Sequence, residues 1–138
     1  METDYIIDSK GNKFKIKTSV GYGAMVTSVV LPELKAVDNM CIAPDGYIFA
    51  KWRDPEYRRS EVLMKHRLLA IADILREGIL LPNVDKLYGF IHYSNKHSSD
   101  WALRNGSYID GEVDIDGTKY DKYICPVENL LKIADSVK

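Results

Sequence analysis

The sequence has few of the residues that usually mark a metal-binding or cofactor-dependent protein. It holds two cysteines in 138 residues, Cys41 and Cys125, and their separation rules out a CxxC pair. The GK[ST] phosphate loop, the three-glycine dinucleotide motif, the calcium-binding EF-hand and the paired-carboxylate motif are all missing. These absences predict no metal and no cofactor, and they favour reduced thiols.

An excess of charge of either sign is also missing. The chain carries 19 basic and 20 acidic residues, for a net charge of -1. Such a chain lacks the overall field that draws proteins to nucleic acids or membrane surfaces, so an anionic partner must meet a local patch. No apolar run reaches transmembrane length, and the N-terminus opens with acids rather than a secretory signal. We therefore expect a cytoplasmic protein.

The length and the 46% of apolar residues predict a single domain, residues 1–138. A hairpin around Ser9–Asn12 and β-branched runs up to residue 53 predict strands. Asp54, Pro55 and Gly78 bracket a long amphipathic helix, and Pro126 starts a short terminal one. The predicted fold class is α+β: a mainly antiparallel sheet with one long helix packed across it and a short C-terminal helix.

The second half of the chain offers further strands. KLYGFIHYS is apolar at nearly every position, which favours a strand covered on both faces, and DWALRN is a shorter candidate. Asp116-Gly117 is a hairpin turn signal. A two-residue turn there pairs Val113 with Tyr120 favourably but sets two acids opposite each other, so the register stays open.

The stretch HYSNKHSSDW could carry chemistry of a metal-independent kind. His92 and His97 could serve as proton acceptor and donor in RNA cleavage, with Lys96 steadying the charged phosphate. A helix followed by antiparallel strands resembles the layout of the barnase, EndoU and RelE group of small nucleases over the second half of the chain. The resemblance is one of layout and includes no motif, so it assigns no residue. An ordinary polar loop explains the same ten residues.

The stretch YIFAKWRDPEYRR interleaves cations with aromatic rings and carries a local surplus of positive charge. Arginine and aromatic planes together can stack a ring and clamp a phosphate, although a capped helix start with solvated arginines explains the pattern equally well. We take this patch as the leading candidate for a binding site. The predicted ligand-binding residues are Trp52, Arg53, Tyr57, Phe90, Asn95, Trp101 and Arg104.

Without a catalytic signature, the sequence favours binding over catalysis. The prediction is a small non-enzymatic protein of the accessory or inhibitor type, including those that phages encode, that recognises an anionic small molecule such as a nucleotide, or a protein surface. Half-exposed tyrosines and edge strands favour a homo-oligomer. The alternative is a ribonuclease that uses His92, His97 and Lys96, with RNA as its partner.

Overall fold

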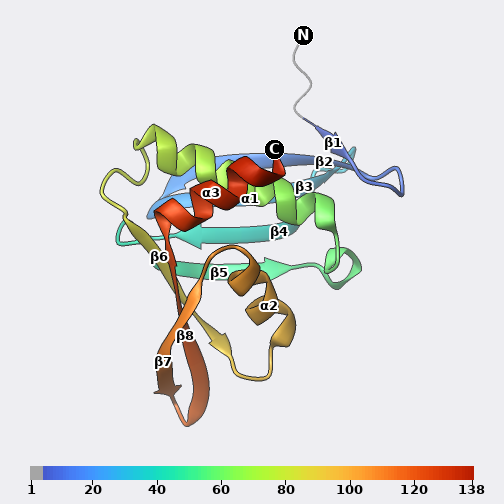
Figure 1. The fold of residues 1–138 in the computed structure, drawn as a ribbon. Helices are drawn as coiled ribbons and strands as arrows, with labels where there is room; N and C mark the ends of the chain where they lie inside the picture. Colours follow the sequence, from blue (N-terminus) through green and yellow to red (C-terminus); the bar gives the residue numbers. More distant parts are fainter. Residues whose placement is uncertain (1–4) are drawn as a thin grey trace.

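The computed structural model describes residues 5–138, so the acidic opening at residues 1–4 lies outside the described part. Two antiparallel sheets form its framework (Figure 1). The larger sheet has the order β1-β2-β3-β4-β5, with strands β1 (Ile6–Ile7), β2 (Lys13–Gly21), β3 (Gly23–Leu31), β4 (Lys35–Ile42) and β5 (Ile48–Arg53). The smaller sheet has the order β6-β8-β7, with strands β6 (Lys86–His92), β7 (Tyr108–Ile115) and β8 (Thr118–Pro126).

Three helices accompany the sheets. Helices α1 (Glu61–Glu77) and α3 (Val127–Val137) contact each other, and α1 also packs on β2 and β3. Helix α2 (Lys96–Arg104) lies near β5 and the smaller sheet (Figure 1). The predicted arrangement of one sheet under one long helix is therefore wrong, because the strands divide into two sheets and a third helix is present.

The third helix arises where the sequence predicted a polar loop and a short strand. Asn95 caps α2 by accepting a hydrogen bond from the Ser98 backbone N–H at 3.2 Å. That cap satisfies one of the free N–H groups of the first turn, so a polar segment with little apolar periodicity still starts a helix. The prediction for β6 also fails: of its seven residues only Leu87 is buried, and β6 forms one edge of the smaller sheet.

The long helix starts later than predicted and ends where predicted. Asp54 and Pro55 begin a separate 3-10 turn, η1 (Pro55–Tyr57), and Ser60 caps α1 by accepting from the Leu63 N–H. Gly78 ends the helix in the left-handed conformation with φ 67°, which costs a glycine little.

Both predicted hairpins are present. Ile6 pairs with Phe14 across the Ser9–Asn12 turn. At the second hairpin Asp116 and Gly117 both have positive φ. A two-residue turn needs this conformation in order to match the right-handed twist of the strands that it joins. Val113 therefore faces Tyr120 in the register that the two-residue turn implies.

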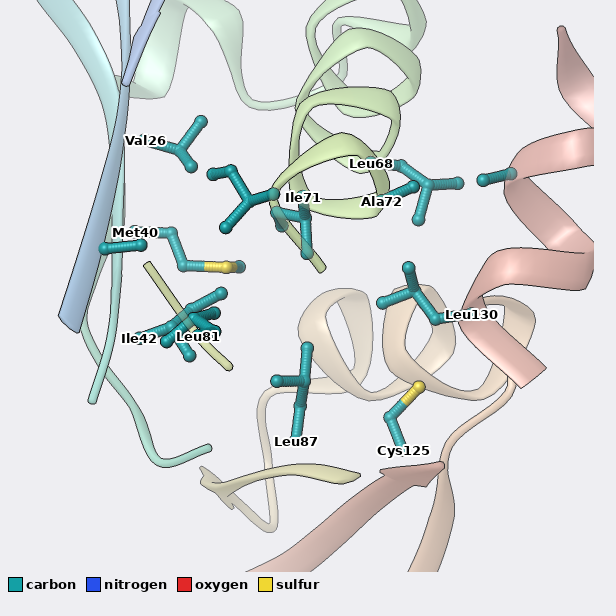
Figure 2. Close-up of a cluster of buried hydrophobic side chains, with 13 residues drawn as sticks. Val26, Met40, Ile42, Leu68, Ile71, Ala72, Leu81, Leu87, Cys125 and Leu130 are labelled. Atoms are coloured by element: carbon teal, nitrogen blue, oxygen red, sulfur yellow. The ribbon is translucent and has the colours of Figure 1, made fainter. Parts of the chain in front are cut away.

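One hydrophobic cluster holds both sheets and two helices together (Figure 2). The larger sheet contributes Met40 and Ile42, α1 contributes Leu68 and Ile71, and the smaller sheet contributes Leu87 and Cys125, all of them buried. Because the cluster draws on every layer, burial of its apolar surface fixes how the two sheets sit relative to each other.

The sheets meet at one point between their parallel strands β5 and β6. Tyr47 and Tyr88 form an isolated parallel bridge, in which the Tyr88 N–H donates to the Gly46 carbonyl at 3.0 Å. Beyond this bridge no further ladder between β5 and β6 occurs in the described residues, and the two strands diverge (Figure 1). The divergence creates a wedge with strand edges on both sides.

Replacing Gly46 by alanine should damage this junction. Gly46 has φ +96°, and an added Cβ would lie 2.2 Å from the Lys86 carbonyl oxygen. We expect Gly46→Ala to lower the free energy of unfolding by about 3 kcal/mol, from backbone strain and the clash together. Gly11 is the matched control, since it has φ +83° with nothing within 4 Å, and Gly11→Ala should cost about 1 kcal/mol. Equal losses in urea unfolding would contradict the close approach at Gly46.

Candidate functional site

A cleft of about 470 Å³ opens at the wide end of the wedge. Its walls come from β5, the following loop, helix α1 and the start of helix α2. The residues that line it are Lys51, Trp52, Arg53, Arg58, Met64, Arg67, Asn95, His97, Ser98 and Trp101. Four of these residues are lysine or arginine, and no carboxylate lines the cleft within residues 5–138.

A buried ion triad supports the floor of the cleft. Arg53 Nε donates to Asp38 Oδ2 at 2.6 Å, and Arg67 Nη1 donates to the same oxygen at 3.0 Å. The side chains of Asp38, Arg67 and Arg53 are 0%, 4% and 11% exposed. Two arginines thus share one carboxylate out of water, which leaves the triad with a net positive charge facing the cleft.

A bulge in β5 sets up this triad. The pairing of β4 with β5 shifts by one residue between Asn39 and Cys41, and Ala50 takes a positive φ of 49°. Asn39 holds the distortion by donating from Nδ2 to the Ala50 carbonyl at 3.0 Å. The shift places Arg53, rather than Trp52, opposite Asp38. Such bulges re-aim side chains and are frequent next to functional sites.

The arginines keep donors that the protein does not use. Arg53 Nη2 and Arg67 Nε are buried and lack a hydrogen-bond partner among the described residues. Burial lowers the pKa of Arg67 to about 10, helped by the nearby Arg53 and opposed by Asp38, so the group stays charged at neutral pH. Buried donors without partners cost free energy, so the two arginines are held in place by the surrounding structure. The cleft is therefore suited to an anion, and bidentate arginine contacts suit phosphate oxygens.

Lys51 faces the same cleft in an unusual environment. Its Nζ lies 4.6 Å from the centre of the Trp101 ring, and the Arg67 guanidinium lies 4.7 Å from that ring. Burial, followed by the charges of Arg67 and Arg53, lowers the pKa of Lys51 to about 7. Water in the open cleft still reaches the Lys51 side chain and screens part of this effect.

Trp101 divides the cavities around the wedge. Its side chain lines the cleft, a pocket of about 90 Å³ beside β5 and β6, and a groove of about 340 Å³ between the three helices. Lys51 also lines both the cleft and the pocket. The indole and the amine therefore stand at the passage from the cationic cleft toward the wedge.

The structure brings together part of the predicted ligand-binding set. Trp52, Arg53, Asn95 and Trp101 all line the cleft, although they come from distant parts of the sequence. Of the others, Phe90 lines the pocket and Arg104 lines the groove, whereas Tyr57 packs edge-on against Phe14 with ring centres 5.4 Å apart.

The residues of the predicted nuclease are separated. His97 lines the cleft, but His92 lies outside it, with Nδ1 hydrogen-bonded to Ser94 Oγ at 2.7 Å. The His92 ring also packs on Tyr93 and Tyr120. Lys96 is exposed at the start of α2 and does not line the cleft. His92 thus has the local partners expected of a structural histidine.

Sequence reasoning missed the two most buried charges of the site, Asp38 and Arg67. Each interrupts an apolar pattern: Asp38 lies in the strand AVDNMCI, and Arg67 falls next to Leu68 on the apolar face of α1. A charge at a core position requires a partner of opposite sign. Applied to Asp38 and Arg67, this rule predicts that the two residues pair with each other, and it is the signal by which the sequence could have revealed them.

Residues 5–138 contain neither a group of metal ligands nor a membrane-crossing helix. No group of three or more histidine, cysteine, aspartate or glutamate side chains there could hold a metal ion. No helix there is both long and apolar enough to cross a membrane.

The sequence matches no protein-family model and no curated protein. The fold, by contrast, is that of the GCN5-related N-acetyltransferases. An uncharacterised protein from Bacillus halodurans superposes with a TM-score of 0.68 at 10% identity, over 96% of this chain and 94% of its own. A GCN5-related N-acetyltransferase from Brucella melitensis gives 0.62 at 11% identity, over 81% of this chain and 54% of its own.

A third structure is that of RimL, a ribosomal L7/L12 α-N-protein acetyltransferase in complex with coenzyme A. It gives a TM-score of 0.61 at 16% identity, over 79% of this chain and 64% of RimL. These neighbours overturn the prediction of a non-enzymatic accessory or inhibitor protein and the ribonuclease alternative, because the neighbours with a stated activity are acetyltransferases. The sequence misled because this cleft is assembled from separate elements and carries no contiguous catalytic motif.

Removal of the Asp38 charge should strongly destabilise the protein. In Asp38→Asn two buried guanidinium groups would face each other without a counter-charge, so we expect the free energy of unfolding to fall by about 4 kcal/mol. Asp73 on α1 is exposed and is the matched control; Asp73→Asn should change stability by less than about 0.5 kcal/mol. Similar urea midpoints for the two variants would contradict the triad.

The lowered pKa of Lys51 predicts a pH dependence of stability. Between about 7 and the ordinary value of 10.5 the unfolded chain binds the Lys51 proton more readily than the folded chain. Stability from this group therefore rises with pH across that window. In urea unfolding, the difference in stability between the wild type and Lys51→Met should shift in favour of the wild type from the lower to the upper end of the window. A pH-independent difference would show that Lys51 titrates normally.

Proposed function

We propose that the protein is an acyltransferase that takes an acyl group from a coenzyme A thioester and transfers it to an amine. The observation that carries the proposal is a cationic cleft at the open end of the wedge, in a fold shared with N-acetyltransferases. RimL, with the same fold, is seen in complex with coenzyme A.

The cleft fits the phosphate-bearing part of such a donor. Arg53 and Arg67 line the cleft with two guanidinium groups that share one carboxylate, and the exposed Arg58 adds a third from the loop after β5. These groups would hold the phosphates of coenzyme A, since arginine binds phosphate with paired hydrogen bonds. Trp52 and Trp101 add aromatic surface for the remaining apolar parts.

The wedge fits the part of coenzyme A that carries amide groups. Past the Tyr47–Tyr88 bridge the facing edges of β5 and β6 are not paired with each other within residues 5–138. Free strand edges can bind an extended chain that carries amides through backbone hydrogen bonds. The thioester supplies an activated acyl group, and the chain supplies the cations, strand edges and walls that position it. An amine acceptor matches the N-acetyltransferase neighbours, and self-association stays a prediction.

Arg58 offers a test of donor binding that leaves the buried triad intact. Arg58→Gln removes an exposed cation of the cleft, whereas Arg59→Gln removes its neighbour, which lines a different surface hollow. We expect Arg58→Gln to weaken coenzyme A binding about tenfold, the loss of one charge-assisted contact, and Arg59→Gln to change it less than about twofold. Both tryptophans line the cleft, so quenching of their fluorescence measures binding directly.

The same titration can refute the proposal. Wild-type protein that shows no quenching or heat of binding with coenzyme A would exclude the donor site. Equal weakening by both substitutions would indicate general charge attraction, because surface charges act over about a Debye length irrespective of exact position. Urea unfolding of both variants confirms that each is folded.

A further inference from the structure

Lys51 lies where the cleft adjoins the small pocket beside β5 and β6. It is the lysine among the residues that line the cleft, and it also lines the small pocket beside β5 and β6. Its Nζ lies over the Trp101 ring at 4.6 Å. No ion pair joins Lys51 to a carboxylate in the part of the chain that the structure describes.

The groups that face Lys51 are mostly cationic. Arg67 approaches from α1 and Arg53 from the same strand, while Arg58 and His97 line the cleft from the loop and from α2. The nearby carboxylate, Asp38, is already bonded to both Arg53 and Arg67. These surroundings disfavour the ammonium form and lower the pKa of Lys51 to about 7, an effect that water in the open cleft partly screens.

Other lysines lack this combination. Lys35 is exposed on β4, lies 3.9 Å from an Asp54 oxygen and lines neither the cleft nor the small pocket. A lysine activated by desolvation and by neighbouring cations is a recognised nucleophile in covalent catalysis. Lys51 thus combines a reactive amine with a position in the proposed donor site.

We propose that Lys51 is a site of self-acylation, where its amine accepts the acyl group of a coenzyme A thioester bound in the cleft. The inference rests on the proposed function. The Lys51 nitrogen forms a bond to the carbonyl carbon, the carbon–sulfur bond breaks, and the thiolate leaves with the electron pair. The thiolate then takes up the proton that the amine loses, so the products are an acylated lysine and free coenzyme A.

Acylation would change the cleft that performs it. Acylation converts the Lys51 amine to an amide, so the cleft loses the contact between the free amine and the Trp101 ring. The added acyl group also occupies space at the passage toward the small pocket. Modified protein should therefore bind coenzyme A more weakly, which makes the modification a built-in limit on activity when donor is abundant.

Site-resolved mass spectrometry tests the proposal with two reagents. Acetyl-coenzyme A requires the cleft, whereas N-acetoxysuccinimide is a small ester that reads amine reactivity alone. At about pH 8 we expect both to acetylate Lys51 about tenfold faster than Lys35, because the lowered pKa of Lys51 favours its nucleophilic amine form. Lys51→Arg should retain the fold, as urea unfolding would show, and lose the fast site, with Lys35→Arg as the matched control. Acetylated wild type should bind coenzyme A about fivefold more weakly in the tryptophan titration, because the added acyl group occupies space beside the small pocket.

The outcomes separate this inference from the proposed function. Protein that binds coenzyme A but acetylates Lys51 no faster than Lys35 with either reagent would overturn the reactive amine and leave the proposed function standing. Fast labelling by the small ester alone, in protein that binds coenzyme A, would overturn transfer from the thioester. Failure of the proposed function appears earlier, as absence of quenching by coenzyme A itself.

Discussion

The buried carboxylate of Asp38 binds two arginines from different layers of the fold, and the site depends on that contact. Arg53 comes from the last position of β5, and Arg67 comes from the second turn of α1. Bringing three charges out of water is costly unless they are paired. The triad therefore fixes the distance between sheet and helix at the floor of the cleft and holds surplus positive charge there.

The surplus charge and the wedge have a common structural origin. The bulge at Ala50 turns Arg53 toward Asp38, and it lies on the strand whose edge separates from β6. The hydrophobic cluster that spans both sheets keeps them together at the narrow end of the wedge. Their backbone pairing there consists of the single bridge between Tyr47 and Tyr88. Burial of one shared cluster and a single bridge thus position the two sheets on either side of the opening.

The cations of the cleft do not play equal parts. Arg53 and Arg67 are both paired with Asp38, and their two guanidinium groups against one carboxylate suit permanent binding of an anion. Lys51 has no such partner and sits beside Trp101, so its charge is the one that the surroundings most readily remove. Anion binding and amine reactivity thus arise from one cluster through differences in pairing.

The sequence by itself determined the features that depend on a few neighbouring residues. These were the two hairpins, the Gly78 end of the long helix and the density of arginine and aromatic residues around Trp52 and Arg53. Turn residues and caps act within a few positions of the chain, so they can be recognised in the sequence without knowledge of the fold.

Only the tertiary structure decided the separation into two sheets, the third helix, and the meeting of Trp52 with Trp101 across the cleft. It also decided the pairing of Asp38 with Arg67. Long-range contacts of this kind depend on which buried surfaces fit together, a property of the whole core that no local pattern encodes.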